Sequence, residues 1–258
     1  MPDTGAATDE APLAILYRDD HLVAIHKPAG LLVHRTALDR HETRFAVQLL
    51  RDQIGQHVWP AHRLDRGTSG VLVFALDADT AGRLGQQFEA QTVAKRYVAV
   101  VRGHPPESGL IDHPLTRQRD DNEWVDPGAQ TAAQPARTTF QRLATIELPI
   151  AVDRYPTSRY ALLQVAPETG RKHQIRRHLK HISHPIIGDA THGKGRHNRM
   201  FAAHFGCQRL LLASTDLWLD HPVSGQRLHL HAAPAADFMA LLDHFGWRAA
   251  LQIQSPPL

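Results

Sequence analysis

The chain of 258 residues combines 42% hydrophobic with 21% charged residues, which excludes a disordered protein and allows one large domain or two small ones. Its single cysteine, Cys207, excludes a disulfide framework and a cysteine-based zinc site. No apolar run reaches roughly 18 residues, and the N-terminus lacks the basic and apolar parts of a signal peptide, so we expect a cytoplasmic protein without a membrane span.

The first sixty residues predict a loose start, two strands and a helix. Residues 1–12 are small and polar with two prolines, so we expect a flexible N-terminal tail. Residues 14–17 and 22–25 are apolar runs joined by a polar turn and predict two strands. Lys27-Pro28-Ala29-Gly30 has the composition of a tight turn. Within residues 42–55 the apolar residues recur on one helical face.

A candidate catalytic loop lies at residues 62–70, which read His-Arg-Leu-Asp-Arg-Gly-Thr-Ser-Gly. Asp65 stands between Arg63 and Arg66, ahead of an apolar run at 71–76 that predicts a buried strand. Loops that lead into core strands commonly present catalytic groups. The two arginines favour an ionised carboxylate if they point at it, and such a carboxylate can attack a sugar or base carbon. The alternative is a surface salt-bridge cluster.

A helix and a strand follow this loop. Residues 77–80 offer helix caps, and apolar residues recur at helical spacing until the helix ends near Gln91. Residues 95–101 read Lys-Arg-Tyr-Val-Ala-Val-Val and predict a strand with a basic entry. By itself, a tyrosine near the start of a strand, as Tyr97 is, is more often a packed core residue.

The region that follows predicts a surface excursion and two further strands. Residues 104–136 are rich in Pro, Gly, Asp and Gln, with a short ordered piece at 110–115 and no periodicity from 119 onward. Residues 138–145 and 158–166 resume strand-like patterns. In total, the sequence predicts many strands and only three or four helices.

The net charge of +3 is unevenly distributed, because residues 171–200 hold eight Lys/Arg and one acidic residue. Within this segment a glycine turn at Gly170 precedes a helix on which Ile175 and Leu179 face the core. The basic residues of the helix cannot all join them there. Such a patch suits a polyanion, and the alternative is a solvated basic face.

Several histidines between 173 and 192 raise the question of a metal site. They form no His-x-x-x-His pair, and no second zinc-motif element accompanies them. We therefore expect no metal there, and we interpret these histidines as contacts to the polyanion or as surface residues.

Taken together, these motifs resemble those of the RluA family of pseudouridine synthases. The similarity covers residues 62–70, the Lys-Pro-x-Gly element, the Lys-Arg-Tyr strand, the Gly-Arg-x-His-Gln-Ile-Arg stretch at 170–176 and the His-Pro-Ile-Ile-Gly-Asp stretch at 184–189. Arg209 to Ser214 and Asp220-His221-Pro222 also match, except that many members carry histidine at the position of Ala213.

The resemblance implies an α+β fold, with a long, bent, mostly antiparallel mixed sheet, flanking helices and a central cleft. It implies that Asp65 is the nucleophile, that Tyr97 is the active-site tyrosine and that Arg176 pairs with Asp65. It implies base flipping, with Arg63 helping to fill the vacated place, and no cofactor. A single catalytic domain at 13–250, without a separate N-terminal RNA-binding module, is expected.

Further stretches outside these motifs are similar to the branch of the family that isomerises uridine 65 of tRNA, such as residues 51–57, 191–199 and 244–248. The alternatives are an rRNA or dual-specificity synthase, a non-catalytic RNA-binding protein and a nucleoside hydrolase. We expect a monomer with tRNA as its partner and no obligate protein partner. The predicted RNA contacts are Arg63, Arg66, Lys27, Arg171, Lys172, His173, Arg177, Lys180, Lys194, Arg196 and Arg199.

Overall fold

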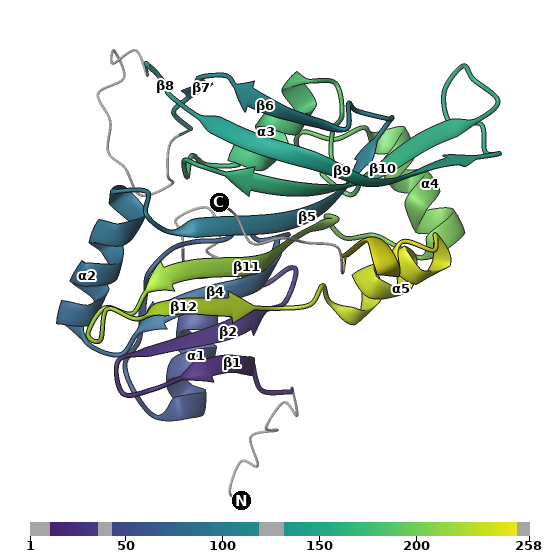
Figure 1. Cartoon of the computed structure of the whole chain (residues 1–258). Helices are drawn as coiled ribbons and strands as arrows, with labels where there is room; N and C mark the ends of the chain where they lie inside the picture. The colour runs from purple at the N-terminus through teal and green to yellow at the C-terminus, as the bar shows by residue number, and fades with distance from the viewer. Residues whose placement is uncertain (1–10, 36–42, 119–131, 252–258) are drawn as a thin grey trace, which may run out of the picture.

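A computed structural model describes residues 11–35, 43–118 and 132–251 of the chain (Figure 1). The described part contains five α-helices, where three or four were predicted. Helices without strong caps or long apolar stripes, such as the fourth, were missed. The helices are α1 (Ala46–Ile54), α2 (Ala78–Glu89), α3 (Gln174–His181), α4 (Gly195–Phe205) and α5 (Ala236–His244), followed by a 3-10 turn, η1 (Arg248–Leu251).

A ten-stranded mixed sheet organises the fold. Its strands are β1 (Ala14–Arg18), β2 (Leu22–Lys27), β3 (Trp59–Pro60), β4 (Ser69–Ala75), β5 (Ala94–Arg102), β6 (Ser108–Asp112), β9 (Arg137–Leu148), β10 (Ser158–Pro167), β11 (Leu212–Asp220) and β12 (Arg227–His231). The order is β1-β2-β4-β11-β5-β10-β9-β6, with β12 beside β11 and β3 beside β4. Only the β4–β11 pair is parallel, so the predicted α+β class with a mostly antiparallel sheet is confirmed.

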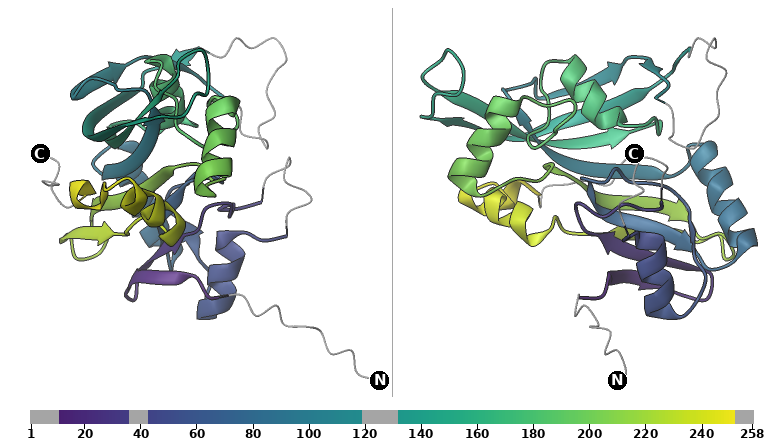
Figure 2. Two further views of the ribbon diagram at one scale, coloured as in Figure 1. Left: turned by 90° about the vertical axis from the view of Figure 1, so that its right-hand side faces the viewer. Right: turned by 180° about the vertical axis from the view of Figure 1, so that it is seen from behind.

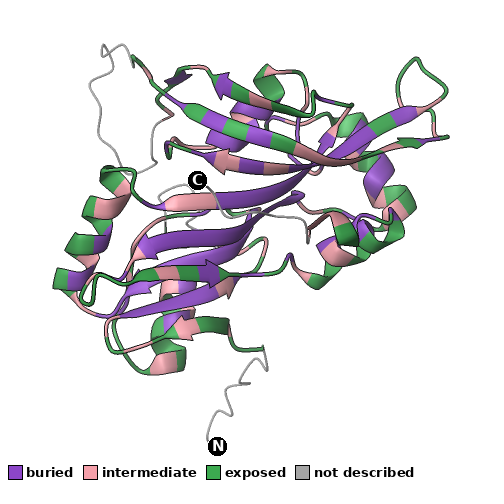
Figure 3. Cartoon of the chain, in the orientation of Figure 1, coloured by how far each residue is buried: buried purple, intermediate pink, exposed green. Residues whose placement is uncertain are grey.

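Helices α1, α3 and α4 lie on one face of the sheet, behind it in Figure 1 and in front of it in the right-hand view of Figure 2. Leu72 and Phe74 of β4 belong to the core cluster beneath α1, and alternate β4 residues belong to a second cluster that includes Leu84 of α2. Every residue of β4 is therefore buried, whereas β9 alternates between buried and exposed residues (Figure 3). Since a one-residue slip would exchange the two faces of such a strand, burial on one face fixes the register of β9.

Local sequence features explain where several of the predicted helices begin and end. Helix α2 begins where the Asp77 side chain accepts a hydrogen bond from the backbone N–H of Thr80 at 2.7 Å, and α1 ends at Gly55 in the left-handed region. The predicted excursion at 104–136 holds β6 and a small sheet of β7 (Leu115–Thr116) and β8 (Ala133–Gln134). The expectations for residues 1–10 and 119–131 lie outside the described residues.

Gly70, the last residue of the 62–70 loop, stands at a position that only glycine can occupy. Gly70 has φ +111°, and a Cβ there would lie 2.0 Å from the Ser214 carbonyl oxygen. Because β4 pairs with β11 in parallel at this point, only glycine lets the two backbones approach so closely. The end of the candidate catalytic loop is thereby held against the centre of the sheet.

Candidate active site

A cleft with a volume of about 580 Å³ opens between the 61–68 loop, the end of α2, the start of β5 and the start of α3. In Figure 1 these segments meet near the upper end of α2. The cleft is of the size typical of small-molecule sites. Seven of the predicted site residues line it: Arg63, Asp65, Tyr97, Arg171, Lys172, His173 and Arg176.

Asp65 sits on a turn that its own backbone closes. The Asp65 carbonyl accepts a hydrogen bond from the N–H of Thr68 at 3.0 Å, and Leu64 beside it is buried. The neighbouring Arg66 carbonyl accepts from the N–H of Gly30 at 2.8 Å, which ties the loop to the Lys-Pro-x-Gly turn. The Asp65 side chain is 25% exposed, so the carboxylate is held from below and open to the cleft.

The guanidinium of Arg176 bridges two carboxylates. Its Nη1 donates to Asp65 Oδ2 at 2.9 Å, while Nε and Nη2 donate to Asp189 Oδ2 and Oδ1 at 2.8 and 2.9 Å. The predicted pairing of Arg176 with Asp65 is therefore present. The second pair is bidentate and buried, and a planar guanidinium suits it because two parallel bonds fix its orientation.

Asp189 completes this arrangement. Burial alone would raise its pKa, but the bonds from Arg176 and from the backbone N–H groups of His192 and Thr191 outweigh burial and lower it. Asp189 is therefore ionised at neutral pH and neutralises Arg176. The charge of Arg176 is thereby shared between two carboxylates, Asp65 and Asp189.

Tyr97 lies on β5 and lines the same cleft. Burial raises the pKa of its hydroxyl to about 12, and the negative charge of Asp65 adds to this effect. The tyrosine is therefore a neutral phenol at physiological pH. It can donate a hydrogen bond or pack a ring against a base, and it can accept a proton only if one leaves in the same step.

A neutral imidazole, His173, borders the carboxylate, and a second one, His192, contacts the first. His173, in the left-handed region at φ 55°, places Nε2 3.9 Å from Asp65 Oδ1 and Nδ1 3.1 Å from His192 Nε2. Burial lowers the pKa of His173 to about 4, although Asp65 opposes the shift, and burial likewise lowers the pKa of His192. Of His173 and Arg176, which both lie beside the Asp65 carboxylate, Arg176 is therefore the one that is charged at neutral pH.

The prediction that Lys27 contacts RNA is wrong. Its side chain is fully buried, and Nζ donates to the carbonyls of Pro28, Leu31 and Arg66 at 3.0, 2.7 and 3.2 Å. Burial lowers the pKa of Lys27 to about 7, which Asp65 partly offsets. A lysine with three carbonyl partners inside the protein cannot reach a phosphate, and it instead fastens the 27–31 turn to the catalytic loop.

The remaining predicted RNA contacts lie outside the cleft lining, some of them near it in sequence and others on α4. Arg66 donates through Nε to the Gly30 carbonyl, and Arg177 through Nη1 to the Thr116 carbonyl, so neither lines the cleft. Lys180 is exposed at the end of α3. Helix α4 lies at the opposite end of the sheet from α2 (Figure 2) and carries the exposed residues Arg196 and Arg199, with Lys194 as its cap.

Sequence reasoning missed three residues of the site. Asp189 had a usable signal, because it is the one acidic residue among eight basic ones in 171–200. Lys95 lines the cleft with a pKa lowered by burial, and its position two residues before Tyr97 puts both side chains on one face of β5. His62 also lines the cleft and stacks on Phe88, a tertiary contact without a sequence signal.

Comparison with known proteins shows the family to which the chain is related. Residues 21–181 match the RNA pseudouridylate synthase family. The protein named tRNA pseudouridine synthase C of Pectobacterium carotovorum subsp. carotovorum is 51% identical over 241 residues, 93% of this chain and 64% of the relative. The one of Yersinia pestis is 51% identical over 235 residues, 91% of each chain. The chain therefore spans less than two thirds of the first relative.

A solved structure shows the same fold. Human RNA Pseudouridylate Synthase Domain Containing 4 matches with a TM-score of 0.68 and 26% identity over 95% of both chains. The mixed sheet and its cleft thus define a pseudouridine synthase fold. Since the family match covers more than half of its length, this chain belongs to the RNA pseudouridylate synthase family, as its motifs indicated. No helix in the described ranges has the length and apolarity to span a membrane.

Proposed function

We propose that this protein isomerises uridine to pseudouridine in tRNA, with Asp65 as the nucleophile. The observation that carries the proposal is the Asp65 carboxylate, open to the cleft on one side and held at 2.9 Å by an arginine that a buried second carboxylate fixes. An ionised, oriented and partly desolvated carboxylate is the group that the reaction needs.

The chemistry conserves all atoms of the uridine. The N1–C1′ bond breaks, the base turns, C5 bonds to C1′, and the hydrogen leaves C5 while N1 gains one. Asp65 serves this sequence either by capturing C1′, as a retaining glycosidase does, or by adding to C6 of the ring. A third route passes through a glycal, in which Tyr97 is the candidate base for the 2′ hydrogen. No redox step occurs, so no cofactor is required.

The cleft implies that the target nucleotide leaves its stack. Asp65 lies inside the protein surface, so a paired base must flip out to reach it. Arg63 is exposed at the rim and is proposed to take the vacated place. Arg171, Lys172 and His173 line the same cleft and are proposed to hold the flanking phosphates, so affinity should fall steeply with salt.

The names of the relatives favour tRNA as the substrate over rRNA. The resemblance of residues 191–199 and 244–248 to the tRNA branch favours uridine 65 of the tRNA as the target. We propose that the enzyme works as a monomer in the cytoplasm, without an obligate protein partner. A single catalytic domain over 13–250 fits the ten-stranded sheet, which combines strands from the first (β1) to the last (β12) of the chain.

Incubation of the pure protein with unmodified tRNA transcripts, without added cofactors, tests the proposal. We expect pseudouridine, mapped to position 65 of the tRNA. Unchanged RNA that is nevertheless bound would indicate an RNA-binding protein, and free uracil with an abasic site would indicate a hydrolase. Pseudouridine in rRNA fragments but not in tRNA would reassign the substrate while leaving the role of Asp65 standing.

A further inference from the structure

A second cluster of chemically active side chains lies on the β11–β12 hairpin. His229 and His231 stand two residues apart on β12 and therefore on one face of the strand. Asp216 on β11 is the direct cross-strand partner of His231. Asp216 Oδ1 lies 2.8 Å from His229 Nε2 and 2.9 Å from His231 Nδ1, and the three atoms lie within 4.8 Å of one another.

This cluster faces away from the catalytic cleft. Lys95 and Tyr97 line the cleft, so Arg96 between them points to the opposite face of β5. There Arg96 Nη1 lies 3.7 Å from Asp216 Oδ2, and its guanidinium stacks over Trp218. The face that carries the cluster is thus separated from the proposed RNA reaction by the thickness of the sheet.

We propose that Asp216, His229 and His231 form a binding site for a divalent transition-metal ion, with zinc as the first candidate. The ligand atoms are Oδ1 of Asp216, Nε2 of His229 and Nδ1 of His231, and solvent completes the coordination. Two imidazoles and one carboxylate are ligands that zinc binds in four-coordinate sites with one open position.

The geometry asks for little rearrangement. The ligand atoms are already as close as neighbouring donors around a small cation, so the ion replaces two hydrogen bonds. Each imidazole only shifts its proton to the other ring nitrogen. Trp218 stacks on His229 with an interplanar angle of 3° and holds that ring in place, while Arg96 stays on the other oxygen of Asp216.

The accessibility of the cluster fits an exchangeable ion. The Asp216 side chain is 5% exposed, whereas those of His229 and His231 are 48% and 60% exposed. A buried, oriented carboxylate beneath two open imidazoles gives an ion both a fixed anionic ligand and an entry path. A bound ion would join β11 to β12 with three coordinate bonds and stabilise the hairpin behind Tyr97.

Titration calorimetry with zinc chloride tests the site, using protein without a polyhistidine tag. We expect the wild type to bind one zinc ion there, and His229→Gln and His231→Gln each to weaken that binding at least about tenfold. Both residues are exposed, so these variants should fold even if Asp216→Asn does not. His181→Gln is the matched control, because His181 stacks on His113 without a carboxylate between the rings and should leave zinc binding unchanged.

Thermal unfolding gives a second readout. Zinc should raise the Tm of the wild type and of His181→Gln but not that of His231→Gln. Absence of zinc binding in the wild type would overturn the proposal and leave the cluster as a hydrogen-bonded lock of the hairpin. Zinc binding that is equally strong in both hairpin variants would overturn it as well and place the ion elsewhere.

Discussion

The carboxylates of Asp19 and Asp65 differ in how many hydrogen bonds they accept. Both oxygens of Asp19 are occupied, by the Tyr17 hydroxyl at 2.6 Å, by His221 Nε2 at 2.8 Å and by the backbone N–H groups of His21 and Leu22 at 2.8 Å. Among the described residues, the hydrogen bond that reaches the Asp65 carboxylate comes from Arg176.

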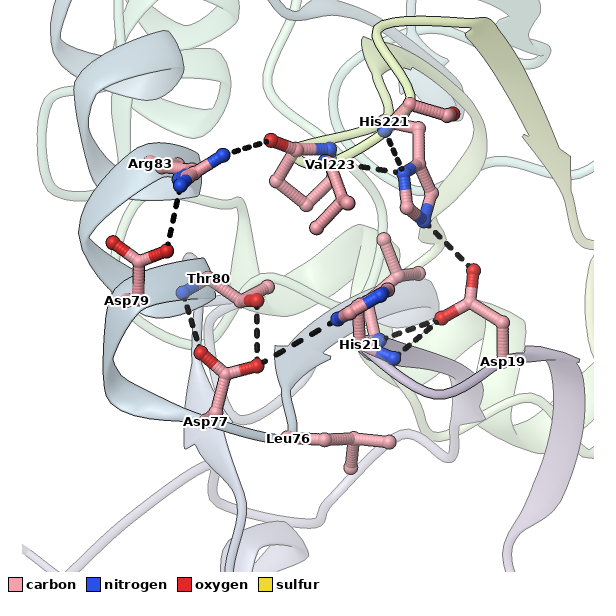
Figure 4. A network of polar contacts seen from close by, with 12 residues as sticks. Asp19, His21, Leu76, Asp77, Asp79, Thr80, Arg83, His221 and Val223 are labelled. Atoms are coloured by element: carbon pink, nitrogen blue, oxygen red, sulfur yellow. Dashed lines mark hydrogen bonds and ion pairs between the residues drawn. The ribbon is translucent and has the colours of Figure 1, made fainter.

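The surroundings of the two residues differ accordingly. Figure 4 shows His221 reaching from the turn after β11 to Asp19, next to His21 and the Asp77 cap of α2. That network joins three chain segments and leaves Asp19 no free lone pair to react. Asp65 lines the cleft, and its Oδ1 lies 3.9 Å from His173 Nε2, beyond hydrogen-bond distance. A saturated carboxylate therefore stabilises the fold, and an incompletely bonded one is available for chemistry.

Neutralising each carboxylate in turn tests whether Asp65 serves the reaction and Asp19 the fold. Asp65→Asn keeps the shape and removes the charge, so we expect it to abolish pseudouridine formation while tRNA affinity stays within a few-fold. Asp19→Asn should retain turnover at temperatures where it is folded. Activity assays and filter binding on both variants check this, and measurable turnover by highly purified Asp65→Asn would remove it from the role of nucleophile.

Arg176→Lys should have the next largest effect. A single ammonium group cannot replace the three bonds to Asp65 and Asp189, and an incompletely paired buried Asp189 costs up to roughly 3–5 kcal/mol. We expect loss of activity together with a lower free energy of unfolding in urea. Arg177→Lys on the same helix is the matched control and should change both little. Equal stability of the two variants would mean that the trio does not act as a unit.

Tyr97→Phe tests the role of the tyrosine hydroxyl while Asp65 stays intact. The change keeps the ring and removes a hydroxyl that burial holds neutral, with a pKa of about 12. If that hydroxyl moves a proton, the single-turnover rate should fall by about 10²-fold or more with tRNA affinity nearly unchanged. Near-normal turnover would show that Tyr97 serves only as a packed ring against the base.

The smallest effect is expected from the charge of Asp19, and it appears in how the free energy of unfolding depends on pH. Burial alone would raise its pKa, but the bonds from Tyr17, Leu22, His21 and His221 outweigh burial and lower it from 3.8 to about 2. Its contribution to stability is thus fully present above about pH 4 and is lost as the pH falls through about 2.

The stability difference between wild type and Asp19→Asn should therefore be largest near neutral pH and shrink toward pH 2. Urea unfolding across this range measures it. Asp20→Asn, at the exposed neighbouring position, is the control and should show no such trend. A difference that does not depend on pH would mean that the charge of Asp19 contributes nothing to the fold.

Local chemistry explains how far the sequence predicted the fold. Alternating and apolar runs predicted β1, β2, β4, β5, β9 and β10, and the Asp77 cap predicted α2. The 195–205 and 236–244 helices were not predicted: neither has a side-chain cap, and the helical apolar spacing by which α1 and α3, which also lack such caps, were predicted was not recognised in them. Whether residues 1–10 form a tail lies outside the described residues.

Site residues that lie in a sequence motif were predicted. Residues whose place in the site depends on tertiary contacts were missed. Asp65 and Arg176 stand 111 residues apart, and the resemblance alone brought them together. Lys27 was misplaced because a sequence does not reveal which lysine the fold buries under three carbonyls. Asp189 lies 13 residues beyond Arg176 and across a turn, so no helical spacing linked them.

Release of tritium from tRNA labelled at C5 of uridine tests the central claim most directly, since isomerisation to pseudouridine expels the C5 hydrogen to water. We expect the wild-type protein alone to release tritium in proportion to the pseudouridine formed, and Asp65→Asn to release none above background while still binding the RNA. Tritium retained in the RNA or in free uracil, or release that is equal in the two proteins, would contradict the claim.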